Sequence, residues 1–273
     1  MTPPPFQRPP GGPIRLLQIT DTHLFADAGG RLLGIDTLAT LDAVVAVAAG
    51  DGPGLDAVLA TGDMVHDGSP AGYDRLCERL GRFGCPVYAL PGNHDAPAQM
   101  QQHMAHPPFQ YLGAATLGDW QIILLDSTVP GEDGGALSAG ELARLDENLR
   151  ASPSAHALVC LHHAPLSVGS AWIDTMALRN SDALLHTITR SPRVRGVVFG
   201  HIHQDYSVEH DGIRLLASPS TCVQFAPRRP RFAVDLVPPG YRRITLQPDG
   251  TIDTEVRRLD GTPAGIDQGA RGY

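Results

Sequence analysis

Residues 14–23, IRLLQITDTH, contain the pattern from which the fold class can be predicted. Its first seven residues are largely apolar, as in a parallel strand that is buried on both faces, and the strand pattern ends at Asp21 and His23. Four later apolar runs of strand length also end in aspartate, asparagine or histidine: residues 57–61 before Gly62-Asp63, 87–90 before Gly92-Asn93-His94-Asp95, 157–161 before His162-His163, and 194–199 before Gly200-His201-Ile202-His203. The chain therefore repeats one unit, a buried strand that stops at side chains able to bind a metal ion.

Helical patterns separate these strands. Residues 38–49 and 73–83 have helix length, and residues 138–149 open with a capping box formed by Ser138 and Glu141. Strands that alternate with helices of this length predict βαβ units. The pattern then changes to short strands joined by Asp-Gly turns, which predicts antiparallel hairpins, at residues 206–210, 213–217, 241–246 and 252–257. We therefore expect an α/β fold with a parallel core and antiparallel strands near its end.

Composition limits the domain organisation and the partners. The 273 residues and 42% apolar content fit one large domain, which we place at residues 14–259 between a disordered Pro-rich tail, 1–13, and a flexible tail, 260–273. The chain has no lysine, and its 21 arginines are outnumbered by 29 acids, which argues against a polymeric nucleic acid partner. No apolar run approaches the roughly 20 residues that cross a bilayer, and no secretory h-region is visible. We expect a cytoplasmic protein with no membrane partner, whose four cysteines, which show no CxxC spacing, are reduced thiols.

The polar residues at the strand ends form the candidate site. Each motif is weak alone, because a D-x-H more often caps a turn and a G-N-H-D is as often a simple turn. Together they supply seven oxygen or nitrogen donors in order along the chain: Asp21, His23, Asp63, Asn93, His162, His201 and His203. The carboxyl ends of strands in an open α/β sheet meet at one edge, where sites form. Seven donors suffice for two ions that share a carboxylate, and the absence of thiolate favours Mn, Fe, Co, Ni or Zn in a catalytic site.

The ordered motif set resembles that of the calcineurin-like metallophosphoesterases, which is D-x-H, G-D-x-x, G-N-H-[DE], H and G-H-x-H, and no member is missing between residues 14 and 259. Three longer stretches resemble the bacterial class III 3′,5′-cyclic-AMP phosphodiesterases of that family: DSTVPGEDGG at 126–135, GSAWIDTMALRN at 169–180 and SPSTCVQFAP at 218–227. The resemblance implies a four-layer αββα sandwich of two mixed β-sheets flanked by helices, with a dinuclear centre at their shared edge.

The resemblance also implies the roles of the site residues. One ion would be held by Asp21, His23, Asp63 and His203, and the other by Asp63, Asn93, His162 and His201. Iron and manganese are the foremost metals. A hydroxide that bridges the ions would attack phosphorus, while His94, oriented by Asp95, would protonate or hydrogen-bond the departing O3′. The substrate contacts would be Asn93, His94 and His203, and the catalytic pair would be Asp63 and His94.

The implied activity is hydrolysis of a 3′,5′-cyclic nucleotide, cAMP first, to the 5′-monophosphate. The motif set leaves other small diesters open, such as glycerophosphodiesters and 2′,3′-cyclic nucleotides, and monomer and homodimer are both compatible with it. A metal-poor binding scaffold is disfavoured, because every donor is present.

The remaining candidates have weaker patterns. His163 would point away from the metals into the core, whereas His66 either reaches the substrate or faces solvent. Trp172 and Asp174 either shape the nucleotide pocket or belong to a turn that covers it. We interpret Asp126 as a structural cap.

Overall fold

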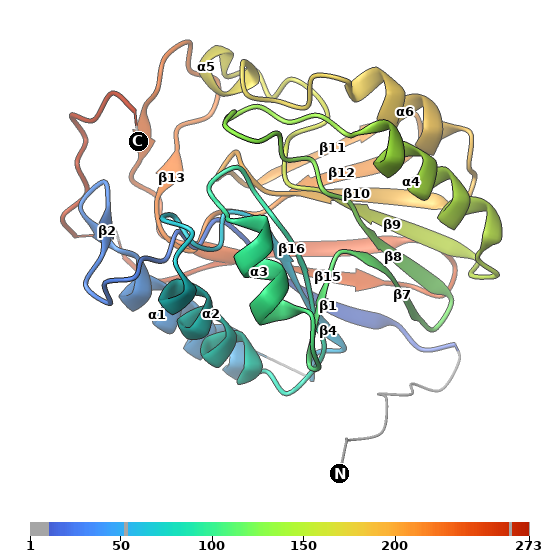
Figure 1. Ribbon diagram of the computed structural model, residues 1–273, viewed down its shortest axis with the longest axis horizontal. Coiled ribbons are helices and arrows are strands. Elements are labelled where there is room, and N and C mark those ends of the chain that lie inside the picture. The colour runs from blue at the N-terminus through green and yellow to red at the C-terminus, as the bar shows by residue number, and fades with distance from the viewer. Residues whose placement is uncertain (1–10, 52–53, 262–263, 273) are drawn as a thin grey trace.

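A computed structural model describes residues 11–51, 54–261 and 264–272 of the chain. Two six-stranded sheets face each other, with helices on both outer faces (Figure 1). The first sheet has the order β16 (Ile252–Arg258), β15 (Gly240–Leu246), β1 (Ile14–Ile19), β4 (Ala57–Thr61), β5 (Val87–Leu90), β6 (Phe109–Tyr111). The second has the order β11 (Tyr206–His210), β12 (Ile213–Ala217), β10 (Val194–Phe199), β9 (His156–Cys160), β8 (Trp120–Leu124), β7 (Gly113–Leu117). Both sheets are mixed, so the predicted αββα sandwich is confirmed.

Helices cover the two outer faces. Three lie along the first sheet, namely α1 (Thr37–Gly50), α2 (Pro70–Gly81) and α3 (Pro97–Met104), and three belong to the second, namely α4 (Ala139–Ala151), α5 (Ala171–Asp174) and α6 (Ser181–Thr189). Short two-residue strands form two further pairs, β2 (Arg31–Leu32) with β3 (Ile35–Asp36) and β13 (Gln224–Phe225) with β14 (Val234–Asp235).

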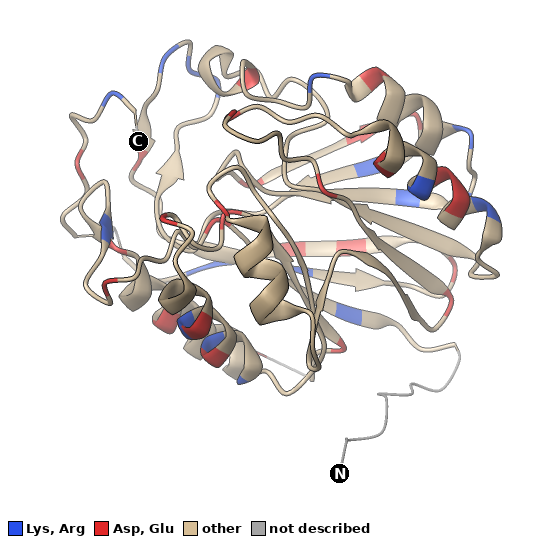
Figure 2. Ribbon diagram, in the orientation of Figure 1, with Lys and Arg blue, Asp and Glu red and all other residues tan. Residues whose placement is uncertain are grey.

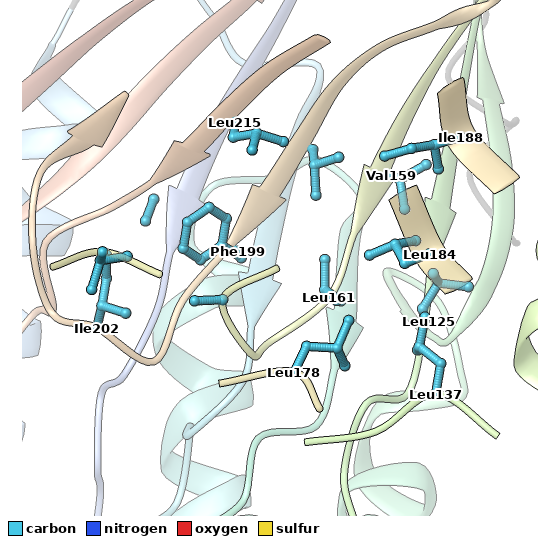
Figure 3. Close-up of a cluster of buried hydrophobic side chains, with 14 of the residues drawn as sticks. Leu125, Leu137, Val159, Leu161, Leu178, Leu184, Ile188, Phe199, Ile202 and Leu215 are labelled. Carbon is cyan, nitrogen blue, oxygen red and sulfur yellow. The ribbon is translucent and has the colours of Figure 1, made fainter. Parts of the chain in front are cut away.

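Alternation along each strand divides the apolar residues among three cores. In β1, Leu17 and Ile19 pack toward the helices, while Ile14 and Leu16 pack between the sheets. The second outer core lies between its sheet and α6, where Phe199, Leu161 and Ile188 are among the side chains drawn in Figure 3. Because both faces are buried, most residues of these strands are apolar, and polar side chains such as Arg15 and Gln18 of β1 are the exceptions.

The predicted boundaries are mostly close to the observed ones. Ser138 caps α4 and accepts a hydrogen bond from the Glu141 amide, as the capping box predicts. Helix α2 begins three residues before the predicted start, because Ser69 caps it and Pro70 occupies its first turn. The β11–β12 and β15–β16 pairs are antiparallel, as predicted. Elements that are short or lack a strong period were not predicted, namely α3, α5, α6, β2, β3, β6, β7, β13 and β14.

The C-terminal segment packs against the second sheet. Residues 1–10 of the predicted N-terminal tail lie outside the described residues. In the C-terminal segment, Ile266 packs against the outer core of the second sheet. The Asp267 amide donates a hydrogen bond of 2.9 Å to the Leu33 carbonyl. None of the helices in the described ranges combines the length and the apolar character that a bilayer crossing requires.

Parallel pairing brings the polar strand ends together. Strand β1 is parallel to β4 and β4 to β5 in one sheet, and β8, β9 and β10 are mutually parallel in the other. The carboxyl ends within each sheet therefore share an edge. The His201 amide bonds both carboxylate oxygens of Asp21 at 3.1 and 3.2 Å, which joins the edges of the two sheets.

Candidate metal centre

Sharp turns place the predicted donors at the shared edge. Asp21, His23, Asp63, His201 and His203 all have positive φ, between 45° and 69°. Such a conformation is costly for residues with a β-carbon and is retained where surrounding structure enforces it, often at functional sites. Here each turn follows a buried strand and directs its side chain across the edge. Five of the seven donors thus share an unusual backbone conformation that ordinary strand ends do not require.

The donor atoms converge. His23 Nε2 lies 3.3 Å from His203 Nε2 and 3.8 Å from Asp63 Oδ2. His203 Nε2 is 3.3 Å from Asp21 Oδ1, and His162 Nε2 is 3.3 Å from Asp63 Oδ2. These side chains are fully buried, and Asp63 lies between the two groups, as a bridging ligand would.

Several buried donor atoms of the seven predicted ligands have no hydrogen-bond partner in the described part of the chain. They are Asp63 Oδ2, Asn93 Oδ1, His162 Nε2 and both ring nitrogens of His201. His162 Nε2 and Asp63 Oδ2 are 3.3 Å apart and form an ion pair when His162 is protonated. Each unsatisfied buried polar group costs about 1–3 kcal/mol, so native structures contain few of them. A cluster of such atoms, all of them ligand types, fits a bound cation.

Backbone carbonyls orient two of the imidazoles. His162 Nδ1 donates to the Thr61 carbonyl at 2.9 Å, and His203 Nδ1 donates to the Val223 carbonyl at 2.7 Å. A carbonyl can only accept, so the proton is on Nδ1 when either ring is neutral. The lone pair on Nε2 then faces the centre, which is the usual arrangement of metal-binding histidines.

Burial and charge tune the same groups. Burial lowers the pKa of His23 and of His201 well below the usual range, which keeps both rings neutral and able to bind a cation. Burial opposes protonation of His162 as well, but the charge of Asp63 outweighs it and raises the pKa of His162 to about 9. A cation that binds His162 through Nε2 must displace this proton.

Asp95 has a different role from the predicted one. Its carboxylate accepts hydrogen bonds from the amides of Gly92, Met64 and Val65 at 2.9 to 3.1 Å, and from the Tyr73 hydroxyl at 2.9 Å. The prediction that it orients the His94 ring was therefore wrong. Asp95 ties the loop after β4 to the loop after β5, and so fixes Asp63 against Asn93.

His94 faces a cavity of about 700 Å³ next to the centre. Its amide donates to Asp63 Oδ1 at 2.9 Å, and its ring stacks on His66 with centroids 4.6 Å apart. Asn93 and His201 line the same cavity, whose opposite side includes Trp172. The third predicted substrate contact, His203, is fully buried, is not among the described residues that line this cavity, and stacks on Phe225 with ring centroids 4.1 Å apart.

The structure also places the weaker candidates. Both His163 ring nitrogens face other groups, Nδ1 the Ser127 hydroxyl at 2.8 Å and Nε2 the Asp133 carbonyl at 3.2 Å, so its predicted core position is supported. Asp126 accepts from the Thr128 amide and hydroxyl and is a structural cap, as predicted. Asp174 likewise accepts from Ser167 and Val168.

Some residues of the site were not predicted, because their roles depend on contacts between distant parts of the chain. Tyr73, Phe225, Phe232, Arg231 and Arg271 support or line the site. The Arg-rich run at residues 228–231 was a visible signal. Phe225 lies in the stretch SPSTCVQFAP at residues 218–227, whereas Tyr73, Phe232 and Arg271 belong to no motif.

Comparison with known proteins settles the family. The sequence pattern described as calcineurin-like phosphoesterase matches residues 14–205. This chain belongs to the calcineurin-like phosphoesterase family. Among members of this family, a protein from Vibrio vulnificus named 3′,5′-cyclic adenosine monophosphate phosphodiesterase CpdA is 45% identical over 247 residues, 90% of each chain. A protein of the same name from Escherichia coli K12 is 40% identical over 261 residues, 95% of each chain.

Solved structures agree on the fold of this phosphoesterase. A dimetal phosphatase from Danio rerio superposes with a TM-score of 0.64 over 90% of this chain and 99% of its own, at 14% identity. At that identity the likeness concerns the fold alone. The family implies a dinuclear metal site, and the unpartnered donors fit it.

Proposed function

We propose that this phosphoesterase is a dinuclear metal-dependent phosphodiesterase that hydrolyses 3′,5′-cyclic nucleotides, cAMP foremost, to the 5′-monophosphate. The observation that carries the proposal is the cluster of unpartnered, buried oxygen and nitrogen donors beneath a cavity of about 700 Å³. A cavity of this size falls in the range of small-molecule sites. The names of relatives that are 40% and 45% identical over nearly their whole length support the choice of cAMP.

The seven donors would hold the two ions in overlapping sets: Asp21, His23, Asp63 and His203 for one ion, and Asp63, Asn93, His162 and His201 for the other. When bound, the two cations would supply Lewis acidity, by neutralising charge on the phosphoryl oxygens and lowering the pKa of water. Iron and manganese are our first candidates, and Zn, Co and Ni remain chemically suitable.

The chain's own groups would position the substrate and move the proton. Asn93 and His94 line the cavity beside the donors, so both can reach a phosphoryl oxygen. His94 is held through its amide by Asp63 and through its ring by stacking on His66. We assign to its imidazole the transfer of a proton, or a hydrogen bond, to the departing O3′, a role worth about 10²–10⁴-fold in rate.

The test combines metal analysis with product identification. Protein loaded with manganese or iron is assayed on 3′,5′-cAMP, 3′,5′-cGMP, 2′,3′-cAMP and bis(p-nitrophenyl) phosphate, and metal per chain is measured. We expect nearly two ions per chain and release of 5′-AMP with kcat/KM of at least about 10⁴ M⁻¹s⁻¹. Turnover of the generic ester without turnover of 3′,5′-cAMP would reject the substrate and keep the class of reaction.

Variants separate binding from proton transfer. Asp63→Asn should lose metal and activity together, because Asp63 is shared by both ligand sets. His94→Ala should keep both ions and lose about 10²–10⁴-fold in kcat. The matched control is His210→Ala, a partly exposed histidine on β11, which should change neither quantity. Full activity of His94→Ala would remove His94 from the reaction.

The cytoplasmic location and the homodimer remain proposals. Cell fractionation tests the location, and analytical ultracentrifugation tests the homodimer.

A further inference from the structure

The cavity beside the metal centre has an outer half that the motif residues do not build. Three segments far apart in the sequence form it: α5 and the residues after it, with Trp172 and Met176; the loop between β13 and β14, with Arg231 and Phe232; and the C-terminal segment, with Arg271. The C-terminal segment runs past β2 and ends near β13 (Figure 1).

The C-terminal segment is fastened where it crosses the β2–β3 turn. Ile266 packs against the outer core of the second sheet, and the Asp267 amide donates to the Leu33 carbonyl at 2.9 Å. Gly34, with φ of 85°, lies so near that a β-carbon there would sit 2.0 Å from the Gly265 carbonyl oxygen. Only glycine permits this approach. Arg271 follows four residues after the Asp267 anchor, so its place at the cavity depends on these contacts.

Aromatic contacts join the outer wall to the metal centre. The Trp172 ring meets Phe225 and Phe232 edge to face, with centroids 5.1 and 5.0 Å apart. Phe225 in turn stacks on His203, one of the predicted ligands, at 4.1 Å. A wall of this kind offers apolar and aromatic surface to a planar base, about 0.5–1.5 kcal/mol per aromatic pair beyond burial.

Charge distinguishes the rim of the cavity from the rest of the molecule. The chain carries a net charge of -8, yet Arg231 and Arg271 both line the cavity, together with one carboxylate, that of Asp133. Both arginines are exposed, and neither forms an ion pair within the ranges that the structure describes. Figure 2 shows basic residues in the loop beside β13 and in the C-terminal segment. Unpaired guanidinium groups at a cavity raise the local concentration of anions and bind phosphate oxygens.

We infer that the C-terminal segment, residues 264–272, is a wall of the substrate cavity, and that Arg271 is a binding determinant for an anionic nucleotide whose base lies against Trp172 and Phe232. The inference rests on the proposed function, because it places the phosphate of that substrate at the metal centre. Arg271 is a binding residue in this scheme and takes no part in bond breaking. Its loss should therefore change KM and leave kcat unchanged.

The experiment uses the full metal-loaded chain and measures kcat and KM for 3′,5′-cAMP and for bis(p-nitrophenyl) phosphate, with calorimetric binding of 5′-AMP as a second readout. Arg271→Gln should raise KM for cAMP, and weaken 5′-AMP binding, about tenfold, as expected for one lost bond to a charged group, while kcat stays within about twofold. Arg271→Lys should recover part of the loss, since it keeps the charge and loses the planar fork. Arg190→Gln, which removes the same charge at the end of α6 and outside the cavity, is the matched control.

A chain that ends at Asp260 tests the wall itself. It should show at least the KM change of Arg271→Gln for cAMP, with a smaller change for the generic ester, which has no nucleoside. Unchanged KM and unchanged 5′-AMP binding in Arg271→Gln would overturn the inference, whether or not the shortened chain folds. If the wild-type protein hydrolyses only the generic ester, the proposed substrate is rejected. If, in addition, neither Arg271→Gln nor the truncation changes KM for that ester, the inference that the C-terminal segment lines the substrate cavity is rejected separately.

Discussion

Nδ1 of His23 and Nδ1 of His66 lie 3.1 Å apart. Because Nε2 of His23 faces Asp63 and His203, a neutral His23 that binds a cation carries its proton on Nδ1, and His66 must then accept through an unprotonated Nδ1. Burial, the largest cause, lowers the pKa of His66 to about 4, in keeping with an acceptor. The same His66 ring stacks on His94. One side chain from the loop after β4 thus touches a predicted ligand and the predicted proton donor.

Replacement of His66 tests this contact. His66→Leu should weaken metal binding and activity about 10–100-fold, the usual effect of losing a group that orients a ligand. His66→Asn should keep most of both, because Oδ1 can accept the same proton. Metal affinity is measured by chelator competition, with His186→Leu on α6 as the control. Equal metal affinity in His66→Leu and wild type would show that the contact orients nothing.

Asp95 predicts a stability effect that is independent of metal. Asp95→Ala removes the acceptor of three buried amides and the Tyr73 hydroxyl, so unfolding free energy should fall by at least about 3 kcal/mol. Asp95→Asn keeps one acceptor oxygen and should lose less. Urea unfolding of the metal-free protein measures both. Asp253→Ala, on edge strand β16, should stay within about 0.5 kcal/mol of wild type; an equally small effect of Asp95→Ala would contradict the structural role.

Gly92 predicts a steric effect on the bridging carboxylate. A β-carbon at Gly92 would lie 2.2 Å from Asp63 Oδ1 and 2.4 Å from the Asp63 amide nitrogen. Gly92→Ala should displace Asp63, reduce metal below two ions per chain and destabilise by about 1–3 kcal/mol or more. Gly50→Ala is the control, since an added methyl there meets no described atom within 4 Å outside its helix, and it should stabilise α1 by about 0.5–1 kcal/mol. Elemental analysis and thermal melting distinguish the two.

The thiols predict a pH dependence. All four cysteines are free, and burial raises the pKa of Cys85 to about 11 and of Cys222 to about 12. Because these folded-state values exceed the usual pKa of about 8.5, the stability that the thiols contribute is complete below about pH 8.5 and is lost as the pH rises through about 11. Unfolding free energy should fall over that interval. At pH 8 a chromogenic disulfide should react only slowly with the native protein, whereas it should react with all four thiols once the protein is unfolded. Rapid reaction of the native protein would show that the buried thiols are accessible.

Local pattern was enough to predict the strands and the donors. Apolar residues predominate in buried parallel strands such as β1 and β4, and an aspartate follows each of them closely, Asp21 after β1 and Asp63 after β4, so that one pattern marks both the strand end and the site. Turn residues and helix caps could also be predicted, because they contact residues only a few positions away, as Ser138 does when it accepts a hydrogen bond from the Glu141 amide. The short elements α5, β13 and β14 escaped prediction, because two to four residues carry no detectable period.

Sequence alone was enough to predict which side chains follow each strand, because burial on both faces favours apolar residues within a parallel strand and leaves most polar groups to its ends. Only the tertiary structure decided what those side chains meet. Asp95 accepts from amides about 30 residues away rather than from the adjacent His94, and His66 meets His23 across 43 positions. Arg271 reaches the cavity because Gly34 and Leu33 hold the chain before it. Such contacts depend on how the sheets and loops pack in space, and they cannot be predicted from the separation of the two residues along the chain.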